Sequence, residues 1–217
     1  MIAAPVFRFD EARHEYFLGE ARIPSATSLI QRGGLYGESA QFFTEASRDR
    51  GRDVHLLCAG WDLGMDYGDW LKEDQPNRGY LLAWMAATDA LKPSWDAIEE
   101  ASVSLKYKYG VRADRVGMVF ARRSVNEIKS GAKLPAKPVS YVDEDTGEIV
   151  TLRGHHVTPH AVQTALQVIA ESERWPLPWD QWQRLTTYVK PNGKFTVDRH
   201  EDRRDFDVAQ TLISRFC

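Results

Sequence analysis

The stretch from Ser102 to Lys129 limits the possible folds more than any other part of the sequence. It holds three short segments, SVSLKYKYGV, RADRVGMVFA and SVNEIKS, which are rich in Val and Tyr and alternate between apolar and polar residues. Such alternation is typical of β-strands. Gly110 and the Arg122-Arg123 pair lie near the expected turns. The sequence therefore predicts three consecutive strands in this region.

Helical patterns flank these strands on both sides. Apolar residues recur at roughly helical spacing over residues 38–63, where Gly51 is a possible interruption, and the segment YLLAWMAATDALKP predicts a helix that ends before Pro93. Thr158 and Pro159 match a helix N-cap followed by Pro at the first helical position, and they open the segment HAVQTALQVIAESE. A closing helix is expected over DFDVAQTLISRF.

Short β-hairpins are expected near both ends of the chain. The opening VFRFDEARHEYFLGEARIP predicts a hairpin, and Ser25 or Thr27 can cap a short helix that stops at Gly33 and Gly34. RLTTYVKPNGKFTVDRH predicts a second hairpin. Residues 131–157 predict a long polar loop with a turn between two short β-like runs.

We therefore expect an α/β fold with a mixed central β-sheet flanked by helices. No internal repeat or linker divides the chain, so residues 1–217 are expected to form a single domain. Within it, residues 1–98 would supply an N-terminal hairpin and helices, and residues 99–217 would form the core.

Composition excludes several classes of protein. Hydrophobic residues make up 43% of the 217 residues, and seven Trp are too many for a disordered chain. No apolar run is long enough to span a membrane, and the N-terminus lacks a secretory signal, so we expect a cytoplasmic protein with no membrane partner. Cys58 and Cys217 are the only cysteines, which excludes a disulfide framework, a four-Cys zinc site and an iron–sulfur cluster.

Positive charge is concentrated in one part of the chain. The net charge is −3, but residues 101–140 carry nine basic residues against two acidic ones and are locally +7. A basic field around two isolated carboxylates suits a polyanion such as nucleic acid held over a metal ion. A solvated charged face is the alternative.

The two acids of this basic segment lie on consecutive predicted strands. A short hairpin can bring Asp114 beside Glu127, and two close carboxylates repel each other unless a divalent cation lies between them. Glu127 and Lys129 are two apart on one strand and therefore point to the same side. Carboxylates suit Mg²⁺ or Mn²⁺, and an ammonium group can stabilise charge on a phosphate, so the trio predicts phosphodiester hydrolysis. A single Glu-x-Lys also arises by chance in such a chain.

The pattern VRADRVG, then SVNEIKSG, then HAVQTALQ resembles the PD-(D/E)XK nuclease superfamily, in its RecB-like and phage-type exonuclease branch. The segments FDEARHEYFLGEARIPSATSLI, RGRDVH, YLLAWMAATDALKP and RLTTYVKPNGKF are similar to this branch in order and spacing, so the resemblance covers most of the chain. It implies a restriction-endonuclease-like core and metal-dependent DNA cleavage with one or two metal ions.

Site residues follow from the resemblance one position at a time. The implied metal-site residues are His55, Asp114, Glu127 and Ile128, and the implied catalytic residues are Asp114, Glu127, Lys129 and Gln163. Glu99 or Glu100 matches the acid that precedes the first core strand. The chain departs from the family pattern at Gln167, where a Tyr is usual, and at Val111, where a Gly is common. His55 could instead be a packed helix residue, and Gln163 a solvated one.

The expected activity is that of a Mg²⁺- or Mn²⁺-dependent DNA nuclease, most simply an exonuclease in phage or bacterial recombination and repair. The basic residues expected to contact DNA are Lys106, Lys108, Arg112, Arg115 and Lys133. The family also implies a single-strand annealing protein as a partner, while the oligomeric state stays open. The alternatives are an endonuclease and a non-catalytic DNA-binding relative that acts as an accessory subunit.

Overall fold

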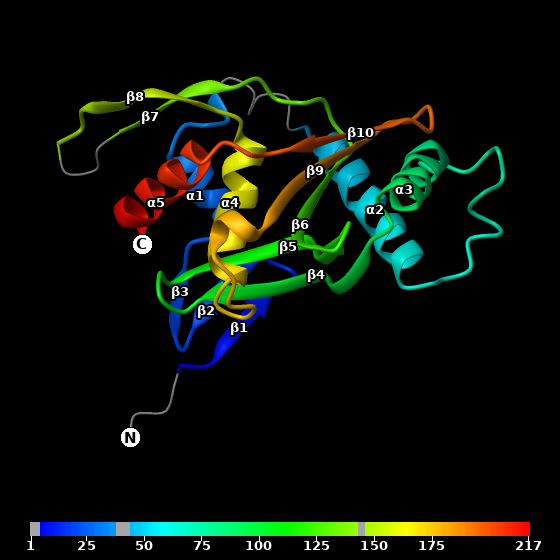
Figure 1. The fold of residues 1–217 in the computed structure, drawn as a ribbon, viewed down its shortest axis with the longest axis horizontal. Coiled ribbons are helices and arrows are strands. Elements are labelled where there is room, and N and C mark those ends of the chain that lie inside the picture. Colours follow the sequence, from blue (N-terminus) through cyan, green and yellow to red (C-terminus); the bar gives the residue numbers. More distant parts are fainter. Residues whose placement is uncertain (1–4, 38–43, 143–145) are drawn as a thin grey trace.

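A mixed five-stranded sheet lies at the centre of the protein (Figure 1). The computed structural model describes residues 5–37, 44–142 and 146–217. The strand order is β10-β9-β6-β5-β4, and neighbouring strands are antiparallel except for β6 and β9, which run parallel. The strands are β4 (Ser94–Ser104), β5 (Tyr109–Val119), β6 (Arg122–Lys129), β9 (Gln183–Val189) and β10 (Phe195–Arg199).

Helices cover both faces of this sheet. The helices are α1 (Ala26–Arg32), α2 (Glu45–Asp62), α3 (Arg78–Leu91), α4 (Pro159–Glu171) and α5 (Arg204–Phe216). Val125 of β6 packs with Val168 of α4, whereas Ile128, three residues further along, packs with Val54 of α2 and Trp84 of α3. Positions three apart on a strand face opposite sides. The predicted α/β fold with a mixed sheet between helices is confirmed.

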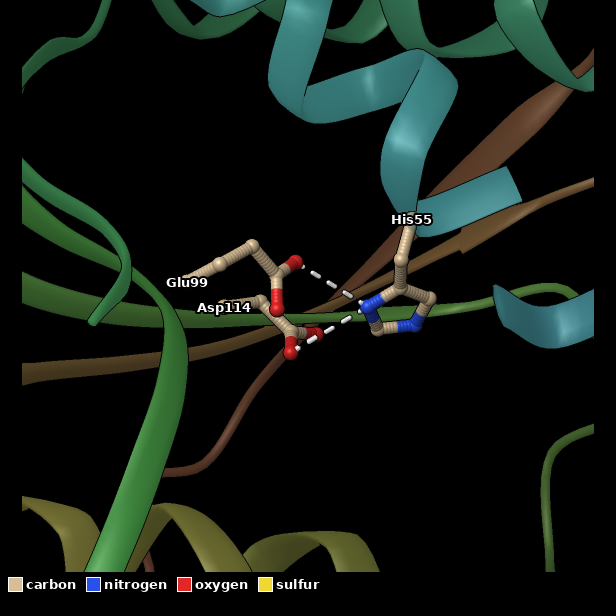
Figure 2. Close-up of side chains that lie close together, drawn as sticks. All are labelled: His55, Glu99 and Asp114. Atoms are coloured by element: carbon tan, nitrogen blue, oxygen red, sulfur yellow. Dashed lines mark hydrogen bonds and ion pairs between the residues drawn. The ribbon is translucent and has the colours of Figure 1, made fainter. Parts of the chain in front are cut away.

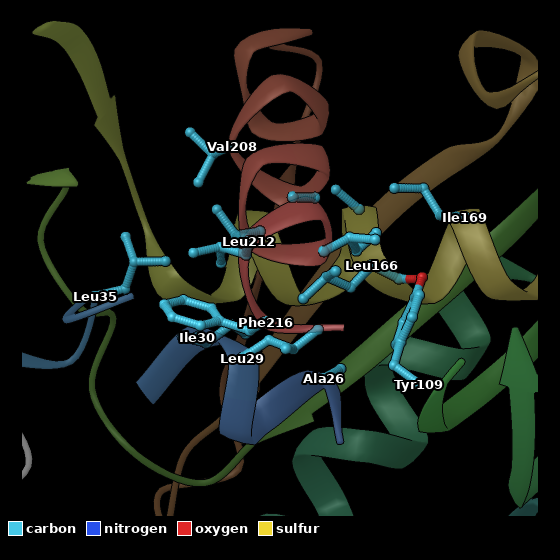
Figure 3. Close-up of a cluster of buried hydrophobic side chains, with 14 of the residues drawn as sticks. Ala26, Leu29, Ile30, Leu35, Tyr109, Leu166, Ile169, Val208, Leu212 and Phe216 are labelled. Atoms are coloured by element: carbon cyan, nitrogen blue, oxygen red, sulfur yellow. The ribbon is translucent and has the colours of Figure 1, made fainter. Parts of the chain in front are cut away.

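Helix α4 is enclosed on all sides. Every residue from Pro159 to Glu171 is buried, because α4 contacts the sheet on one side and α1 and α5 on the other. Figure 3 shows the apolar side chains that these helices share, including Leu29, Leu166 and Leu212. Tyr109 joins the sheet to this core, since its hydroxyl donates to the Leu166 carbonyl at 2.6 Å.

Most predicted local elements are present. The N-terminal hairpin is part of a small sheet of β1 (Phe7–Asp10), β2 (Glu15–Leu18) and β3 (Ala21–Ile23), and Ser25 is the N-cap of α1. The two β-like runs expected within residues 131–157 are present as the antiparallel strands β7 (Lys137–Val142) and β8 (Ile149–Val157). A short 3-10 helix, η2 (Trp179–Gln181), precedes β9.

Three predicted boundaries differ from the structure. The predicted strand SVSLKYKYGV is wrong as a single strand, because it holds the end of β4, a turn at residues 105–108 and the start of β5. Helix α2 runs unbroken through Gly51, and the first part of its predicted range, residues 38–43, lies outside the described residues. Strand β4 begins at Ser94, so the predicted limit between residues 1–98 and 99–217 falls inside a strand. Organisation as a single domain stays a prediction. In the part of the chain that the structure describes, no helix is long and apolar enough to cross a membrane.

Removal of the N-cap of α4 should destabilise the protein. The side chain of Thr158 accepts a hydrogen bond from the Ala161 N–H at 3.1 Å. We expect Thr158→Ala to lower the free energy of unfolding by about 1 kcal/mol, while Thr158→Ser, which keeps the acceptor, retains most of it. Urea unfolding followed by circular dichroism measures both values. Equal stability of the two variants would contradict this role of the hydroxyl.

Candidate metal centre

Three side chains from three different elements meet between α2 and the sheet: His55 of α2, Glu99 of β4 and Asp114 of β5 (Figure 2). His55 Nδ1 lies 3.1 Å from Glu99 Oε1 and 3.3 Å from Asp114 Oδ1. One ligand atom from each residue lies within 4.8 Å of the other two. An imidazole nitrogen and two carboxylates are ligands for divalent cations, so this cluster can hold one.

Helix α2 places His55 at the edge of its buried face. The neighbouring Val54 and Cys58 are fully buried against Trp84 of α3. The His55 side chain is 26% exposed and points to the two acids rather than into that apolar cluster. A purely packing role does not account for its two polar contacts.

Glu99 reaches the cluster because the backbone leaves the regular strand conformation there. Its φ angle of 53° lies in the left-handed region, which costs a non-glycine residue about 1–3 kcal/mol and is common at functional sites. The register of β4 and β5 is the same on both sides of this residue, with Ile98↔Arg115 and Glu100↔Ala113, so Glu99 lies opposite Asp114. Glu100 instead contacts Arg174 at 2.9 Å and is half-exposed. Of the two candidate acids, Glu99 is therefore the one in the cluster.

The alternation of side chains along β5 also shifts at Asp114. Ala113 and Val116 pack with Val168 of α4, although they are three residues apart, while Arg115 lies on the α2 side and contacts Asp62. Asp114 Oδ2 accepts a hydrogen bond from the Ile128 N–H at 2.6 Å. The irregular backbone therefore directs the Asp114 carboxylate to both His55 and β6.

Glu127 lies beside this cluster but has different partners. It is only 1% exposed, and Lys129 Nζ contacts its Oε2 atom at 2.7 Å. The Nε2 group of Gln167 on α4 donates to its other oxygen. The expected pair of Glu127 and Lys129 on one side of β6 is thus present, whereas His55, Glu99 and Asp114 form the closest set of metal-ligating atoms among the described residues.

Charge coupling dominates the titration of the cluster. Burial disfavours a charged imidazole, but the Asp114 and Glu99 carboxylates outweigh it and raise the pKa of His55 to about 10. Burial also opposes ionisation of Asp114, yet His55, Lys129 and the Ile128 N–H lower its pKa to about 2. Burial and the Asp114 charge raise the pKa of Glu127. A proton on His55 therefore compensates for one buried carboxylate, and a divalent cation would take over that role.

A buried ion pair between Arg115 and Asp62 adjoins Glu99. Arg115 has no exposed side-chain surface; its Nε donates to Asp62 Oδ2 at 2.5 Å and its Nη1 to Glu99 Oε1 at 3.2 Å. Trp84 Nε1 donates to Asp62 Oδ2 at 3.1 Å. The expectation that Arg115 contacts DNA is inconsistent with this burial, because no part of the guanidinium reaches the surface. Asp62, which the sequence did not single out, fixes Arg115 and through it Glu99.

The other basic residues expected to contact DNA lie in three places. Lys106 and Lys108 are in the turn between β4 and β5, next to the C-terminal end of α5. Arg112 donates to the Glu99 carbonyl at 3.0 Å, close to the cluster. Lys133 is exposed and contacts Asp198 at 2.7 Å.

Helix α4 carries the predicted site residue Gln163 and a second glutamine, Gln167. Gln167, noted only as a departure from the family pattern, contacts Glu127, while Gln163 lies one turn earlier and is also buried. Both face inward because α4 is enclosed, which its amphipathic pattern alone does not predict. Ile128 contributes its N–H to Asp114 and its side chain to the apolar cluster of α2 and α3.

Comparison with known proteins supports the fold. No protein-family model matches the sequence, and no curated protein matches it. The structure is similar to that of a protein from Eubacterium rectale named "putative exonuclease", with a TM-score of 0.52, 10% identity, and coverage of 88% of this chain and 77% of that one. A second structure, SSO0001, gives a TM-score of 0.40 at 14% identity, with coverage of 91% and 78%. At this identity the first similarity concerns the fold alone.

Neutralising Glu99 should weaken metal binding, while neutralising its neighbour should not. We expect Glu99→Gln to reduce the affinity for Mn²⁺ by at least about tenfold, because one of two carboxylate ligands loses its charge. Glu100→Gln is the matched control, since Glu100 contacts Arg174 instead. Isothermal titration calorimetry with Mn²⁺ measures both. Equal affinities of the two variants would remove Glu99 from the metal centre.

Breaking the buried ion pair should destabilise the whole fold. Asp62→Ala leaves the guanidinium of Arg115 buried without its main partner, which costs about 3–5 kcal/mol. The control is Asp89→Ala, which breaks an exposed pair with Lys92 and should change stability by less than about 1 kcal/mol. Denaturant unfolding compares them. Similar small losses in both variants would show that Arg115 does not depend on Asp62.

Proposed function

We propose that this protein is a Mg²⁺- or Mn²⁺-dependent deoxyribonuclease of the PD-(D/E)XK superfamily, in its RecB-like branch, and that it degrades DNA from its ends. One observation carries the proposal. The cluster of His55, Glu99 and Asp114 lies beside the Glu127–Lys129 pair, so a set of metal ligands and a cationic side chain adjoin one another. The similarity in fold to the Eubacterium rectale protein is consistent with it.

The ligand set fits the proposed cation. Carboxylate oxygens suit both Mg²⁺ and Mn²⁺, and an imidazole nitrogen is a better ligand for Mn²⁺ than for Mg²⁺. Glu99 and Asp114 each keep one oxygen that the hydrogen bonds from Arg115 and Ile128 do not use. When bound, such a cation would polarise a phosphate oxygen and lower the pKa of a water molecule.

The residues of β6 supply the rest of the proposed chemistry. Lys129 places its ammonium group 2.7 Å from Glu127, and burial of Glu127 holds that group in one position. A fixed positive charge next to the metal ligands can stabilise the negative charge that develops on a phosphate during hydrolysis. Gln167 holds the other oxygen of Glu127 and so fixes the pair from α4.

Charge along the chain supports DNA as the substrate. The +7 charge of residues 101–140 is spread over strands β4 to β7 and their connections, and the same stretch contains Asp114 and Glu127. Of the residues expected to contact DNA, Lys106, Lys108, Arg112 and Lys133 have accessible side chains and stay in the proposal. Positive side chains of this kind displace counterions from phosphates.

Loss of the Lys129 charge should abolish cleavage. With end-labelled linear DNA and Mg²⁺ or Mn²⁺, we expect Lys129→Ala to reduce the rate by at least about 100-fold, the size typical of lost electrostatic stabilisation. Lys92→Ala, which removes an exposed lysine paired with Asp89, should cleave like the wild type. EDTA should stop DNA cleavage by the wild type and by Lys92→Ala.

The form of the DNA decides between the proposed activity and its alternatives. Degradation of linear but not closed-circular DNA supports an exonuclease. Cutting of closed circles would show an endonuclease, and wild-type protein that binds DNA without any metal-dependent cleavage would show a non-catalytic relative.

A further inference from the structure

A cavity of about 390 Å³ adjoins the metal centre, between the first half of α2 and the segment that follows β6. Ser47, Gly51 and His55 line it from α2 at intervals of four residues, so one face of the helix borders the cavity. Lys129 lines it from the sheet. Because His55 and Lys129 belong to both the cavity and the proposed active site, a ligand in the cavity would lie next to the reacting phosphate.

The lining of this cavity is suited to an anion. Arg50 and Lys129 contribute permanent positive charges, and Ser47 and Ser130 contribute hydroxyl groups. Within the described part of the chain, no carboxylate side chain lines the cavity. This distinguishes it from the neighbouring metal centre, where acidic side chains predominate.

Arg50 is the residue lining this cavity that has a buried polar atom without a hydrogen-bond partner. Its Nε atom is buried and has no hydrogen-bond partner among the described residues. A buried N–H without a partner loses its hydration with no compensation, which costs more than an ordinary hydrogen bond contributes. Two arginines nearby do have acidic partners: Arg52 contacts Asp49, and Arg115 contacts Asp62 although its Nη2 atom is also unpartnered.

We propose that this cavity binds a phosphate of the DNA strand next to the bond being cut, with Arg50 as its main ligand. The inference rests on the proposed nuclease function and adds a substrate-binding residue to it. A guanidinium presents a fork of N–H donors that matches two phosphate oxygens. With one phosphate on Arg50 and the next beside Lys129, the strand would be held in register with the metal centre.

A binding experiment without metal tests this inference independently of turnover. The affinity for fluorescent single- and double-stranded oligonucleotides is measured in EDTA over a series of salt concentrations. We expect Arg50→Ala to bind at least about tenfold more weakly and to reduce the slope of log K against log salt concentration by about one, because one phosphate contact is lost. Arg50→Lys should keep the slope, since it keeps the charge.

Arg52→Ala is the matched control. Arg52 lies on the same helix two residues away, hence about 200° around its axis, and its side chain is exposed beside Asp49. Its removal should leave the salt slope unchanged. An unchanged slope in Arg50→Ala, or an equal loss in Arg52→Ala, would overturn the inference, because the effect would then be absent or due to net charge alone.

Three further measurements complete the test. Unchanged Mn²⁺ affinity in Arg50→Ala and Arg50→Lys would show that both variants keep the fold of the metal centre, so that a lost contact is not a folding defect. Wild-type cleavage of DNA combined with an unaffected Arg50→Ala would reject this phosphate site alone, whereas wild-type protein that neither binds nor cleaves DNA would reject the nuclease proposal itself. The binding experiment is repeated with oligonucleotides that end in a phosphate and with oligonucleotides that end in a hydroxyl group. If Arg50→Ala weakens binding only of the phosphate-ended oligonucleotides, the bound phosphate is a terminal one. If it weakens binding of both kinds, the bound phosphate is internal.

Discussion

Compensation of buried negative charge is the constraint on which the arrangement of α2 and the neighbouring strands depends. Four carboxylates lie there: Asp62, Glu99, Asp114 and Glu127. Their cationic partners are Arg112, Arg115, Lys129 and the protonated form of His55. A buried carboxylate without such partners would be strongly destabilising. The left-handed conformation of Glu99, which lies opposite Asp114 on the neighbouring strand, is the backbone feature that accompanies this grouping.

The same charges explain why a cation and a phosphate suit this place together. With a neutral imidazole, the four carboxylates face three permanent positive charges and leave a net charge of −1. A divalent cation would reverse this to +1, and a phosphodiester, with its charge of −1, would then restore neutrality. The acidic side chains around His55 thus form the part of the region suited to the metal. The positive side chains of Arg50 and Lys129 form the part suited to the substrate.

Local sequence patterns predicted most of the helices and strands. The site residues that these patterns missed depend on contacts between distant parts of the chain. Helix caps such as Ser25 and Thr158 depend on residues a few positions away, and both are observed. Strict alternation along a strand cannot reveal that Glu99 turns toward α2, because the backbone of Glu99 has a left-handed φ angle. The burial of Arg115 depends on Asp62, which is distant in sequence. Gln167 contacts Glu127 because α4 packs on β6, and since the whole of α4 is buried, periodicity within it gave no preference for Gln167 over Gln163.

A crystal structure of the protein grown or soaked with Mn²⁺, with data collected at a wavelength where manganese scatters anomalously, tests the central claim most directly. We predict an anomalous peak bounded by His55, Glu99 and Asp114, with Lys129 still directed at Glu127. A well-ordered cluster that shows no peak there at millimolar Mn²⁺, or a peak held by other residues, would contradict it.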